Sequence, residues 1–190
     1  MQLIIASRNI HKIRQLRSML KFYEIFDILS LLDFPHYTPL PDIAGSLEKT
    51  AIQKAEHAAQ ALGQWTIADA TALTIPALQS SFEADADGRK KLLLAMQHLN
   101  DTDRQAYFEC WLALASPAGL KKCGKASSEG VIATSQRGGN GFGFDSLFIK
   151  HEYGKTFAEM DEEMYSRISH RRKALDRLHP SLEVLALQDA

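Results

Sequence analysis

Two short segments of the chain carry side chains that could bind a purine nucleotide. Residues 138–145 read Gly-Gly-Asn-Gly-Phe-Gly-Phe-Asp, and Ser-His-Arg follows further along at residues 169–171. The glycines let the backbone turn tightly and approach a flat ligand. Phe142 and Phe144 could stack on a base, and Asp145 could accept hydrogen bonds from ring N–H groups. Taken alone, the first segment fits a tight β-turn with core aromatic side chains better, because short glycine motifs often match by chance.

A strand followed at once by a helix is expected near the N-terminus. Residues 3–6 are apolar, and apolar residues recur at helical spacing through residues 10–20. Ser7, Asn9 and Lys12 occupy the junction and the first helical turn, where free backbone N–H groups and the helix dipole attract phosphate. These residues are candidates for binding a polyphosphate. The alternative is a solvated basic helix face on which Ser7 or Asn9 is an ordinary N-cap.

Taken together, these motifs resemble the inosine/xanthosine triphosphate pyrophosphatase family over nearly the whole chain. The family's Thr-Gly-Asn-x-x-Lys turn is similar to residues 7–12 here, and its Gly-Phe-Gly-Tyr-Asp motif is similar to residues 141–145. The family's Glu-Asn-Ala helix, Ala-Asp-Asp-Ser-Gly-Leu turn, Gly-Lys-Thr-Phe-Ala-Glu segment and Ile-Ser-His-Arg motif resemble residues 48–62, 68–73, 154–160 and 168–171. Several motifs in the family's order are more specific than any one of them.

The resemblance implies a fold, a reaction and a set of binding residues. Members of the family cleave purine nucleoside triphosphates to monophosphate and pyrophosphate, and their elongated α/β fold has two lobes with a central nucleotide-binding cleft. We therefore expect hydrolysis of the non-standard triphosphates ITP, dITP and XTP with Mg²⁺ as the divalent cation, and the resemblance leaves room for a homodimer. The nucleotide-binding residues that it implies are Ser7, Asn9, Lys12, Thr71, Phe142, Gly143, Phe144, Asp145, Lys155, His170 and Arg171.

Cleavage between the α and β phosphates needs a divalent ion, a positioned water and a carboxylate. The family has two adjacent aspartates before its Ser-Gly turn, and the second accepts the proton and binds the metal. This chain has Asp69 followed by Ala70. The resemblance therefore implies Asp69 as the catalytic residue and Asp42 with Asp69 as metal ligands, with Glu48 as an alternative to Asp42. Asp42 or Glu48 could instead be a solvated surface carboxylate.

The chain departs from the family's pattern in ways that support a second hypothesis. Arg8 and Ala72 replace turn glycines, and the family's Gly/Pro-rich segment expected after Leu78 is absent. A degenerate relative would bind nucleotide, or a protein partner, without hydrolysis. A third hypothesis, an unrelated core-packed α/β domain, would require every motif to be a coincidence.

The elements that would position these residues follow from the apolar pattern. Helices are expected at residues 48–62, ending at Gly63, and at residues 89–99 and 164–178. Strands are expected at residues 65–69 and 130–134. Residues 105–116 could be a strand or a buried helix, and the turn at residues 117–119 favours a hairpin. The sequence thus predicts an α/β fold with a mixed sheet wrapped by helices.

Composition narrows the class of protein further. The chain has 190 residues, of which 45% are hydrophobic and 24% charged, with a net charge of -1, so we expect one globular domain over residues 1–190. The absence of a basic excess argues against a nucleic-acid partner. No apolar run is long enough for a membrane span, and no signal-peptide pattern is present, so we expect a cytoplasmic protein. Cys110 and Cys123 are expected to be free thiols. Neither lies in a CxxC or Cys/His pattern, so we do not expect a zinc site.

Overall fold

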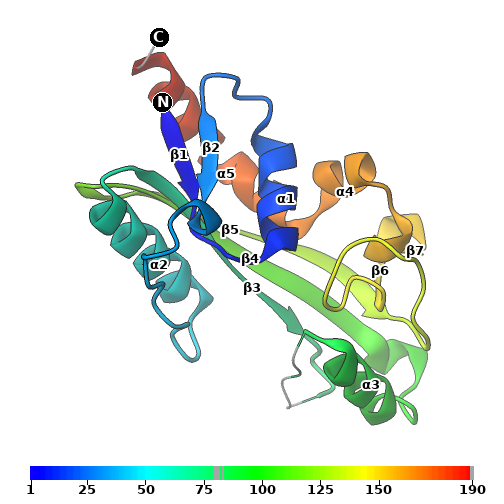
Figure 1. The fold of residues 1–190 in the computed structure, drawn as a ribbon. Coiled ribbons are helices and arrows are strands. Elements are labelled where there is room, and N and C mark those ends of the chain that lie inside the picture. Colours follow the sequence, from blue (N-terminus) through cyan, green and yellow to red (C-terminus); the bar gives the residue numbers. More distant parts are fainter. Residues whose placement is uncertain (79–81, 83, 189–190) are drawn as a thin grey trace. The chain divides into compact units, whose positions relative to one another are not determined.

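The computed structural model describes residues 1–78, 82 and 84–188 and contains one seven-stranded sheet in the order β2-β1-β3-β4-β5-β6-β7 (Figure 1). β1 pairs in parallel with both β2 and β3, whereas β6 pairs in antiparallel with β5 and β7. The prediction of a mixed sheet is therefore confirmed. The strands are β1 (Gln2–Ile5), β2 (Asp27–Ser30), β3 (Trp65–Thr74), β4 (Gln105–Ser116), β5 (Gly119–Ile132), β6 (Phe148–Lys150) and β7 (Lys155–Thr156).

Five α-helices among the described residues complete the α/β fold that the sequence predicts. They are α1 (Ile10–Leu20), α2 (Leu47–Leu62), α3 (Ala86–Ala95), α4 (Glu162–Ile168) and α5 (His170–Gln188). The predicted end of α2 is confirmed, because Gly63 has a φ of 67° and takes the left-handed conformation that stops the helix. The hairpin predicted after residue 116 is also confirmed, with a second strand much longer than residues 130–134.

Two other helices differ from the expectation. α3 begins at Ala86, before the predicted residue 89, because the Asp85 carboxylate accepts a hydrogen bond from the Gly88 N–H at 2.7 Å and caps the helix. The single helix expected over residues 164–178 is two helices. Ser169, with φ -65° and ψ 158°, is extended between them. Apolar periodicity continues across such a break and cannot reveal it.

The chain divides into two compact units. The first comprises residues 1–71, 110–126 and 170–190, and the second comprises residues 72–109 and 127–169. β3, β4 and β5 each continue from one unit into the other. The expectation of one domain over residues 1–190 stays a prediction. The segment expected to be shortened after Leu78 includes residues 79–81 and 83, which lie outside the described residues.

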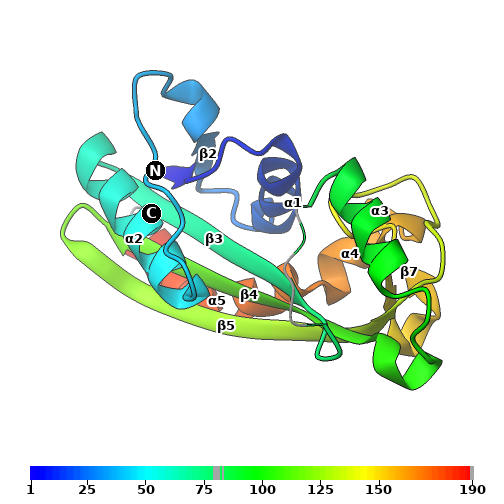
Figure 2. The same ribbon diagram turned by 90° about the horizontal axis from the view of Figure 1, so that it is seen from below.

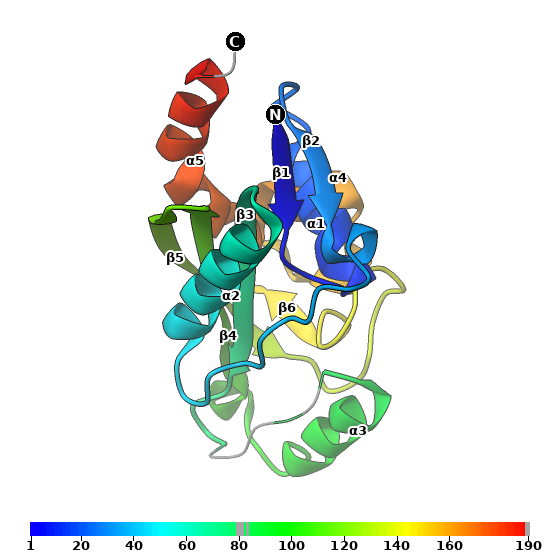
Figure 3. The ribbon, with the colours of Figure 1, turned by 60° about the vertical axis from the view of Figure 1, so that its left-hand side comes forward.

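Within the first unit, α2 packs on one face of the strands through a seam of alanines. Ala51, Ala55 and Ala59 recur every fourth residue and are fully buried against alanines of β3 and β4. Such small side chains let the helix lie close to the strands. The opposite face of β3 carries contacts to α1 and α5, and Figures 2 and 3 show α2 and α5 on different sides of the strands.

Aromatic rings and one arginine form the interior of the second unit. The Phe148 ring centroid lies 4.8 Å from that of Phe108 and 5.0 Å from that of Phe157. The buried Arg104 guanidinium donates to the carbonyls of Met96, Ile132 and Ala133 at 2.6–2.9 Å. The arginine thus ties the end of α3 to the end of β5.

The expectations about the two cysteines and about membrane-spanning segments can be compared with the structure. Cys110 is buried, Cys123 is half-buried, and both are free thiols, as predicted. Among the described residues, no helix has the length and apolar character needed to cross a membrane.

The alanine seam leads to a stability prediction. Ala55→Leu should lower the free energy of unfolding by about 1–3 kcal/mol, because it inserts a larger side chain into a filled interface. Ala61→Leu, at an exposed position of the same helix, is the matched control and should change stability by less than about 0.5 kcal/mol. Urea unfolding of both variants measures the difference. Equal effects would show that the seam is loosely packed.

Candidate functional site

Asp69 of β3 lies at the centre of a charged cluster in the first unit. Its Oδ2 atom is 3.1 Å from the Lys12 ammonium of α1 and 3.1 Å from Nη2 of Arg171 in α5. The Arg171 Nε also donates to this oxygen, at 3.2 Å. The cluster therefore joins three elements that are far apart in the sequence.

Two uncharged side chains complete the cluster. The Thr71 hydroxyl donates to Asp69 Oδ2 at 3.0 Å and accepts from Arg171 Nη2 at 3.3 Å. Arg171 Nη1 donates to the Gln15 side-chain oxygen. The structure thus brings together four sequence-predicted residues, namely Lys12, Asp69, Thr71 and Arg171, and adds Gln15.

The charges of the cluster decide the state of the carboxylate. Burial by itself would raise the pKa of Asp69, but the charges of Lys12 and Arg171 outweigh burial and hold the pKa well below its usual range. Asp69 is therefore ionised at neutral pH and is a weak proton acceptor. Two cations around one carboxylate leave a net charge of about +1, which attracts anions.

Ser7 and Asn9 form the local structure that starts α1. The Asn9 Oδ1 accepts from the backbone N–H groups of His11 and Lys12 at 3.0 and 3.2 Å, so Asn9 is the N-cap. The Ser7 hydroxyl accepts from the Asn9 N–H at 3.1 Å. The capping alternative therefore agrees with the contacts of Asn9, whereas Ser7 lies before the cap and holds the Asn9 backbone. Together the two side chains fix the position of the Lys12 backbone.

His170 does not supply the positive charge that its neighbour Arg171 does. The His170 side chain is buried, and burial, with a further contribution from Arg171, lowers its pKa well below 6.5. The imidazole is therefore neutral at neutral pH. The sequence predicted His170 as a nucleotide-binding residue and gave no sign of its burial, because burial depends on the packing of distant elements.

The two aspartates expected to share a metal ion have different surroundings. Asp42 is 72% exposed and forms an ion pair with Lys54 of α2, whereas Asp69 contacts α1 and α5. Glu48 is exposed in the first turn of α2. Among the described residues, no group of three or more His, Cys, Asp or Glu side chains could hold a metal ion. Any divalent ion would thus need ligands beyond these side chains.

Ala70 faces away from the charged cluster. It is buried in the alanine seam with Ala51 and Ala55 of α2, while its neighbour Asp69 faces α1 and α5. Adjacent residues in a strand point to opposite faces. Asp69 therefore cannot place its carboxylate where an aspartate at position 70 would stand.

In the second unit, residues 138–145 form a tight loop against residues 157–160. The N–H groups of Gly139 and Asn140 donate to the Ala158 carbonyl at 3.1 and 3.0 Å. Gly141 has a φ of 75°, and a Cβ there would lie 2.4 Å from Asp145 Oδ2, so the loop requires glycine at this position. The sequence signal for a glycine-dependent turn was correct.

The two phenylalanines of this loop differ in their exposure to solvent. Phe142 is half-buried, whereas Phe144 is only 6% exposed and belongs to the core. The Asp145 carboxylate accepts from the Phe142 N–H at 2.9 Å and so shapes the turn. The Gly143 carbonyl accepts from Arg89 of α3 at 3.0 Å, and Lys155 is exposed at the start of β7. Phe142 is therefore the ring better placed to stack on a base.

Three side chains that sequence reasoning missed support these residues. They are Gln15 beside Arg171, Lys54 beside Asp42 and Arg89 beside Gly143. Gln15 lies one helical turn after Lys12, and this spacing was the available signal. Nothing in the local sequence pairs Lys54 or Arg89 with its partner.

Curated proteins resemble this chain along almost its full length. A dITP/XTP pyrophosphatase of Protochlamydia amoebophila is 47% identical, with 97% of this chain and 99% of the relative covered. A dITP/XTP pyrophosphatase of Chlamydia trachomatis serovar L2 is 45% identical, with 97% and 94% covered. Both alignments extend over 197 residues, which exceeds the 190 residues of this chain. The relatives thus contain residues without a counterpart in this chain.

Solved structures share the fold. The Ham1 protein of Coxiella burnetii superposes with a TM-score of 0.80 at 30% identity, covering 96% of this chain and 98% of the other. The Staphylococcus aureus Ham1 protein gives a TM-score of 0.79 at 30% identity, with the same coverage. The model of the Ham1 family matches residues 3–181. This match, together with the 45–47% identity of the relatives, shows that the chain belongs to the Ham1 family.

Proposed function

We propose that the chain hydrolyses non-standard purine nucleoside triphosphates, with ITP, dITP and XTP as substrates and a nucleoside monophosphate and pyrophosphate as products. The names of relatives at 45–47% identity support this reaction, because those matches cover 97% of the chain. The structural observation that supports it most is the cationic cluster of Lys12 and Arg171 around Asp69 at the start of α1.

The phosphate groups are assigned to residues of the first unit. The Lys12 side chain is 23% exposed, so its ammonium can contact both Asp69 and an anion. The N-terminus of α1 adds the positive end of a helix dipole, and its first turn contains no acidic residue. Ser7 and Asn9 set the position of these N–H groups, while Thr71 and Arg171 hold the carboxylate.

The base is assigned to residues of the second unit. Phe142 provides a half-buried ring for stacking. Gly143, with a φ of 59°, lies buried against Ala84 and helps to shape the turn that presents this ring. Phe144 and Asp145 shape the loop that presents Phe142. Lys155 adds an exposed positive charge. The neutral His170 belongs to the first unit and can donate one hydrogen bond and accept another.

A divalent cation fits this chain only in part. Asp69 is a poor ligand because two cations already surround its carboxylate, whereas the exposed Asp42 can bind an ion if Lys54 moves aside. Mg²⁺ usually binds one or two carboxylates together with substrate phosphates. We assign Mg²⁺ to Asp42 and the phosphate oxygens, where it would offset the charge of the triphosphate.

The chemistry of this chain's own residues is chiefly positioning and charge stabilisation. Asp69 keeps Lys12 and Arg171 in fixed places, and fixed cations stabilise the negative charge that develops on a transferring phosphoryl group. That role differs from the proton acceptance expected for Asp69, which stays a prediction. A cytoplasmic nucleotide pool as the source of substrate and a homodimeric assembly also remain parts of the proposal.

The reaction is tested by measuring pyrophosphate release from ITP, dITP, XTP and ATP, with and without Mg²⁺. We expect cation-dependent turnover of the first three and much less turnover of ATP. A folded protein that binds ITP but releases no pyrophosphate with Mg²⁺ or Mn²⁺ would instead support the degenerate relative. Asp69→Asn in the same assay separates catalysis from positioning, because a proton acceptor is needed for turnover and not for ITP binding.

A substitution at Ala70 tests, in the same pyrophosphate assay, whether turnover is limited by the missing second carboxylate. Ala70→Asp restores the carboxylate that serves as the family's proton acceptor, on the α2 face of β3. It should raise turnover by roughly 10²–10⁴-fold if the attacking water and the phosphate reach that face and not only the face with Lys12. Its stability should fall, because the carboxylate enters the alanine seam. Ala70→Asn is the matched control, because the Asn side chain has nearly the same size as that of Asp and carries no charge. Equal turnover of the two folded variants would contradict the prediction.

Lys12 can be tested by comparing ligands that differ in their distal phosphates. Lys12→Ala should weaken inosine triphosphate binding by roughly 10–100-fold, since a hydrogen bond to a charged group contributes about 1.5–3 kcal/mol. Inosine monophosphate lacks the distal charges and should lose much less affinity. Lys21→Ala, at the other end of α1, controls for net charge. Calorimetric titration decides, and equal losses for both ligands would remove Lys12 from the phosphate site.

The division between Phe142 and Phe144 gives a further prediction. Phe142→Ala should weaken inosine triphosphate binding by about 1–3 kcal/mol and leave stability nearly unchanged, as expected for a stacking ring. Phe144→Ala should lower the free energy of unfolding by about 3–5 kcal/mol, since the ring is buried. Calorimetry and urea unfolding measure the two effects. Unchanged binding by the folded Phe142→Ala protein would show that the ring does not contact the base.

A further inference from the structure

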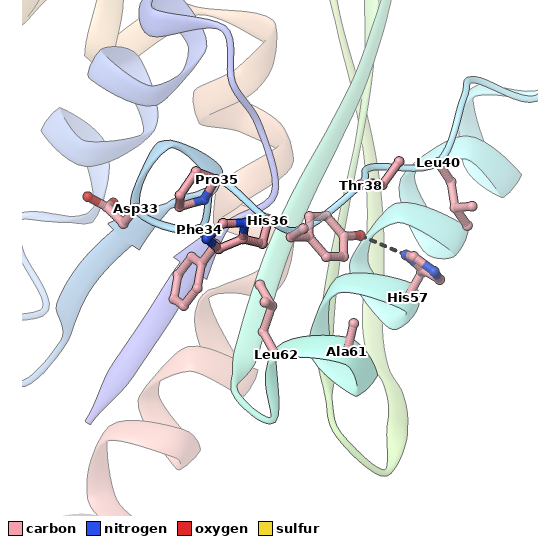
Figure 4. A pocket seen from close by; sticks show the side chains of 10 residues that line it. Asp33, Phe34, Pro35, His36, Thr38, Leu40, His57, Ala61 and Leu62 are labelled. Carbon is pink, nitrogen blue, oxygen red and sulfur yellow. Dashed lines mark hydrogen bonds between the residues drawn. The ribbon is translucent and has the colours of Figure 1, made fainter.

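A pocket of the first unit lies between the loop after β2 and the C-terminal half of α2. Its volume is about 710 Å³, and none of its lining residues belongs to the cluster around Asp69 (Figure 4). Small-molecule pockets commonly measure about 300–1,000 Å³. The pocket is therefore large enough for a bicyclic ligand that carries a further ring.

The loop that forms one wall of this pocket is held from three sides. Arg8 Nη2 donates to the carbonyls of Tyr37 and Pro35 at 2.6 and 3.3 Å. The Tyr37 hydroxyl is hydrogen-bonded to Nδ1 of His57 in α2 at 2.7 Å, as Figure 4 shows. The Asp33 carboxylate accepts from the Ser30 N–H at 2.8 Å. A wall that is already ordered loses little entropy when a ligand binds.

The lining combines aromatic faces with polar tips. Phe34 and Tyr37 are half-buried rings, and the Tyr37 and His57 ring centroids lie 5.5 Å apart. Hydrogen-bonding groups come from Tyr37, the imidazoles of His36 and His57 and the Thr38 hydroxyl. A planar heteroaromatic ring matches this surface because it offers apolar faces for stacking and donors and acceptors at its edge. The Tyr37 hydroxyl and His57 Nδ1 bond each other, so the edge of the ligand would meet the other imidazole nitrogens and the Thr38 hydroxyl, which an aliphatic ligand could not use.

The lining offers no cationic partner to a phosphate group. Asp33 is the single acidic residue among the described lining residues, and none of them is Lys or Arg. Arg17 Nη2 lies 3.7 Å from the Asp33 carboxylate, so that charge is paired. The Arg8 guanidinium is engaged by the carbonyls of Pro35 and Tyr37. The pocket therefore suits an uncharged ligand better than a phosphorylated one, unlike the cluster around Lys12.

We propose that this pocket is a second binding site for an uncharged nucleoside, separate from the site proposed for the triphosphate. The Arg8 contacts give the pocket a physical link to the turn that starts α1, because Arg8 stands between Ser7 and Asn9. A ligand that contacts the loop at Pro35 and Tyr37 would therefore affect Arg8, whose side chain binds their carbonyls and which belongs to the proposed phosphate-binding turn. The binding itself does not depend on the proposed hydrolysis.

Inosine is the probe, and Ala61→Trp is the variant that fills the pocket. Ala61 lines the pocket at an exposed position of α2, so a larger side chain enters the pocket without disturbing the core. Gln60→Trp adds the same ring at the neighbouring exposed position, which does not line the pocket, and is the matched control. All proteins carry Phe142→Ala, so that the proposed stacking site does not contribute. Binding is followed by calorimetry and by saturation-transfer NMR.

We expect inosine to bind the Gln60→Trp protein as it binds the parent, and Ala61→Trp to weaken binding by at least about tenfold, or 1.4 kcal/mol. Inosine monophosphate should bind the parent more weakly than inosine. Failure of the parent to bind inosine, equal binding by both Trp variants, or stronger binding of the monophosphate would each overturn the proposal. Sedimentation of the variants is measured alongside, and a change of oligomeric state confined to Ala61→Trp would identify the pocket as an interface between copies and also overturn it.

Discussion

The buried ion pair between Asp69 and Arg171 is the interaction on which the first unit depends. Removing both charges from water is costly, and the cost is offset only when the pair has good geometry and further hydrogen bonds. Here Thr71, Gln15 and Lys12 supply those contacts. Because the partners come from β3, α1 and α5, removing either charge of the pair would cost about 3–5 kcal/mol and would disturb all three elements.

The same interaction gives the first unit its chemical character. One carboxylate cannot neutralise two cations, so positive charge remains where α1 begins. The helix dipole adds to that charge, since no acid occupies the first turn. Positive charges held close together raise the free energy of the unliganded protein, and a bound polyphosphate would lower it. The stability of the fold and the affinity for an anion therefore share one cause.

Alternation along β3 explains why the substitution at position 70 is compatible with the fold. Side chains on one face of the strand meet α1 and α5, and those on the other meet the alanines of α2. The Ala70 methyl group is buried and extends the alanine seam. The chain thus keeps its cationic cluster while lacking the family's second carboxylate, because the two features lie on opposite faces of one strand.

The sequence by itself determined the family, the α/β class and most of the elements. α1 and α2 follow from apolar spacing and a C-terminal glycine, and the loop at residues 138–145 follows from its glycines, since these are local properties of the backbone.

Only the tertiary structure decided which side chains face each other. It made His170 neutral by burial, separated Phe142 from Phe144 by exposure, and paired Asp42 with Lys54. It also broke the last helix at Ser169 and placed Arg171 against Asp69, a contact 102 residues apart in the chain. Burial and long-range pairing depend on how elements pack, and no local pattern encodes them.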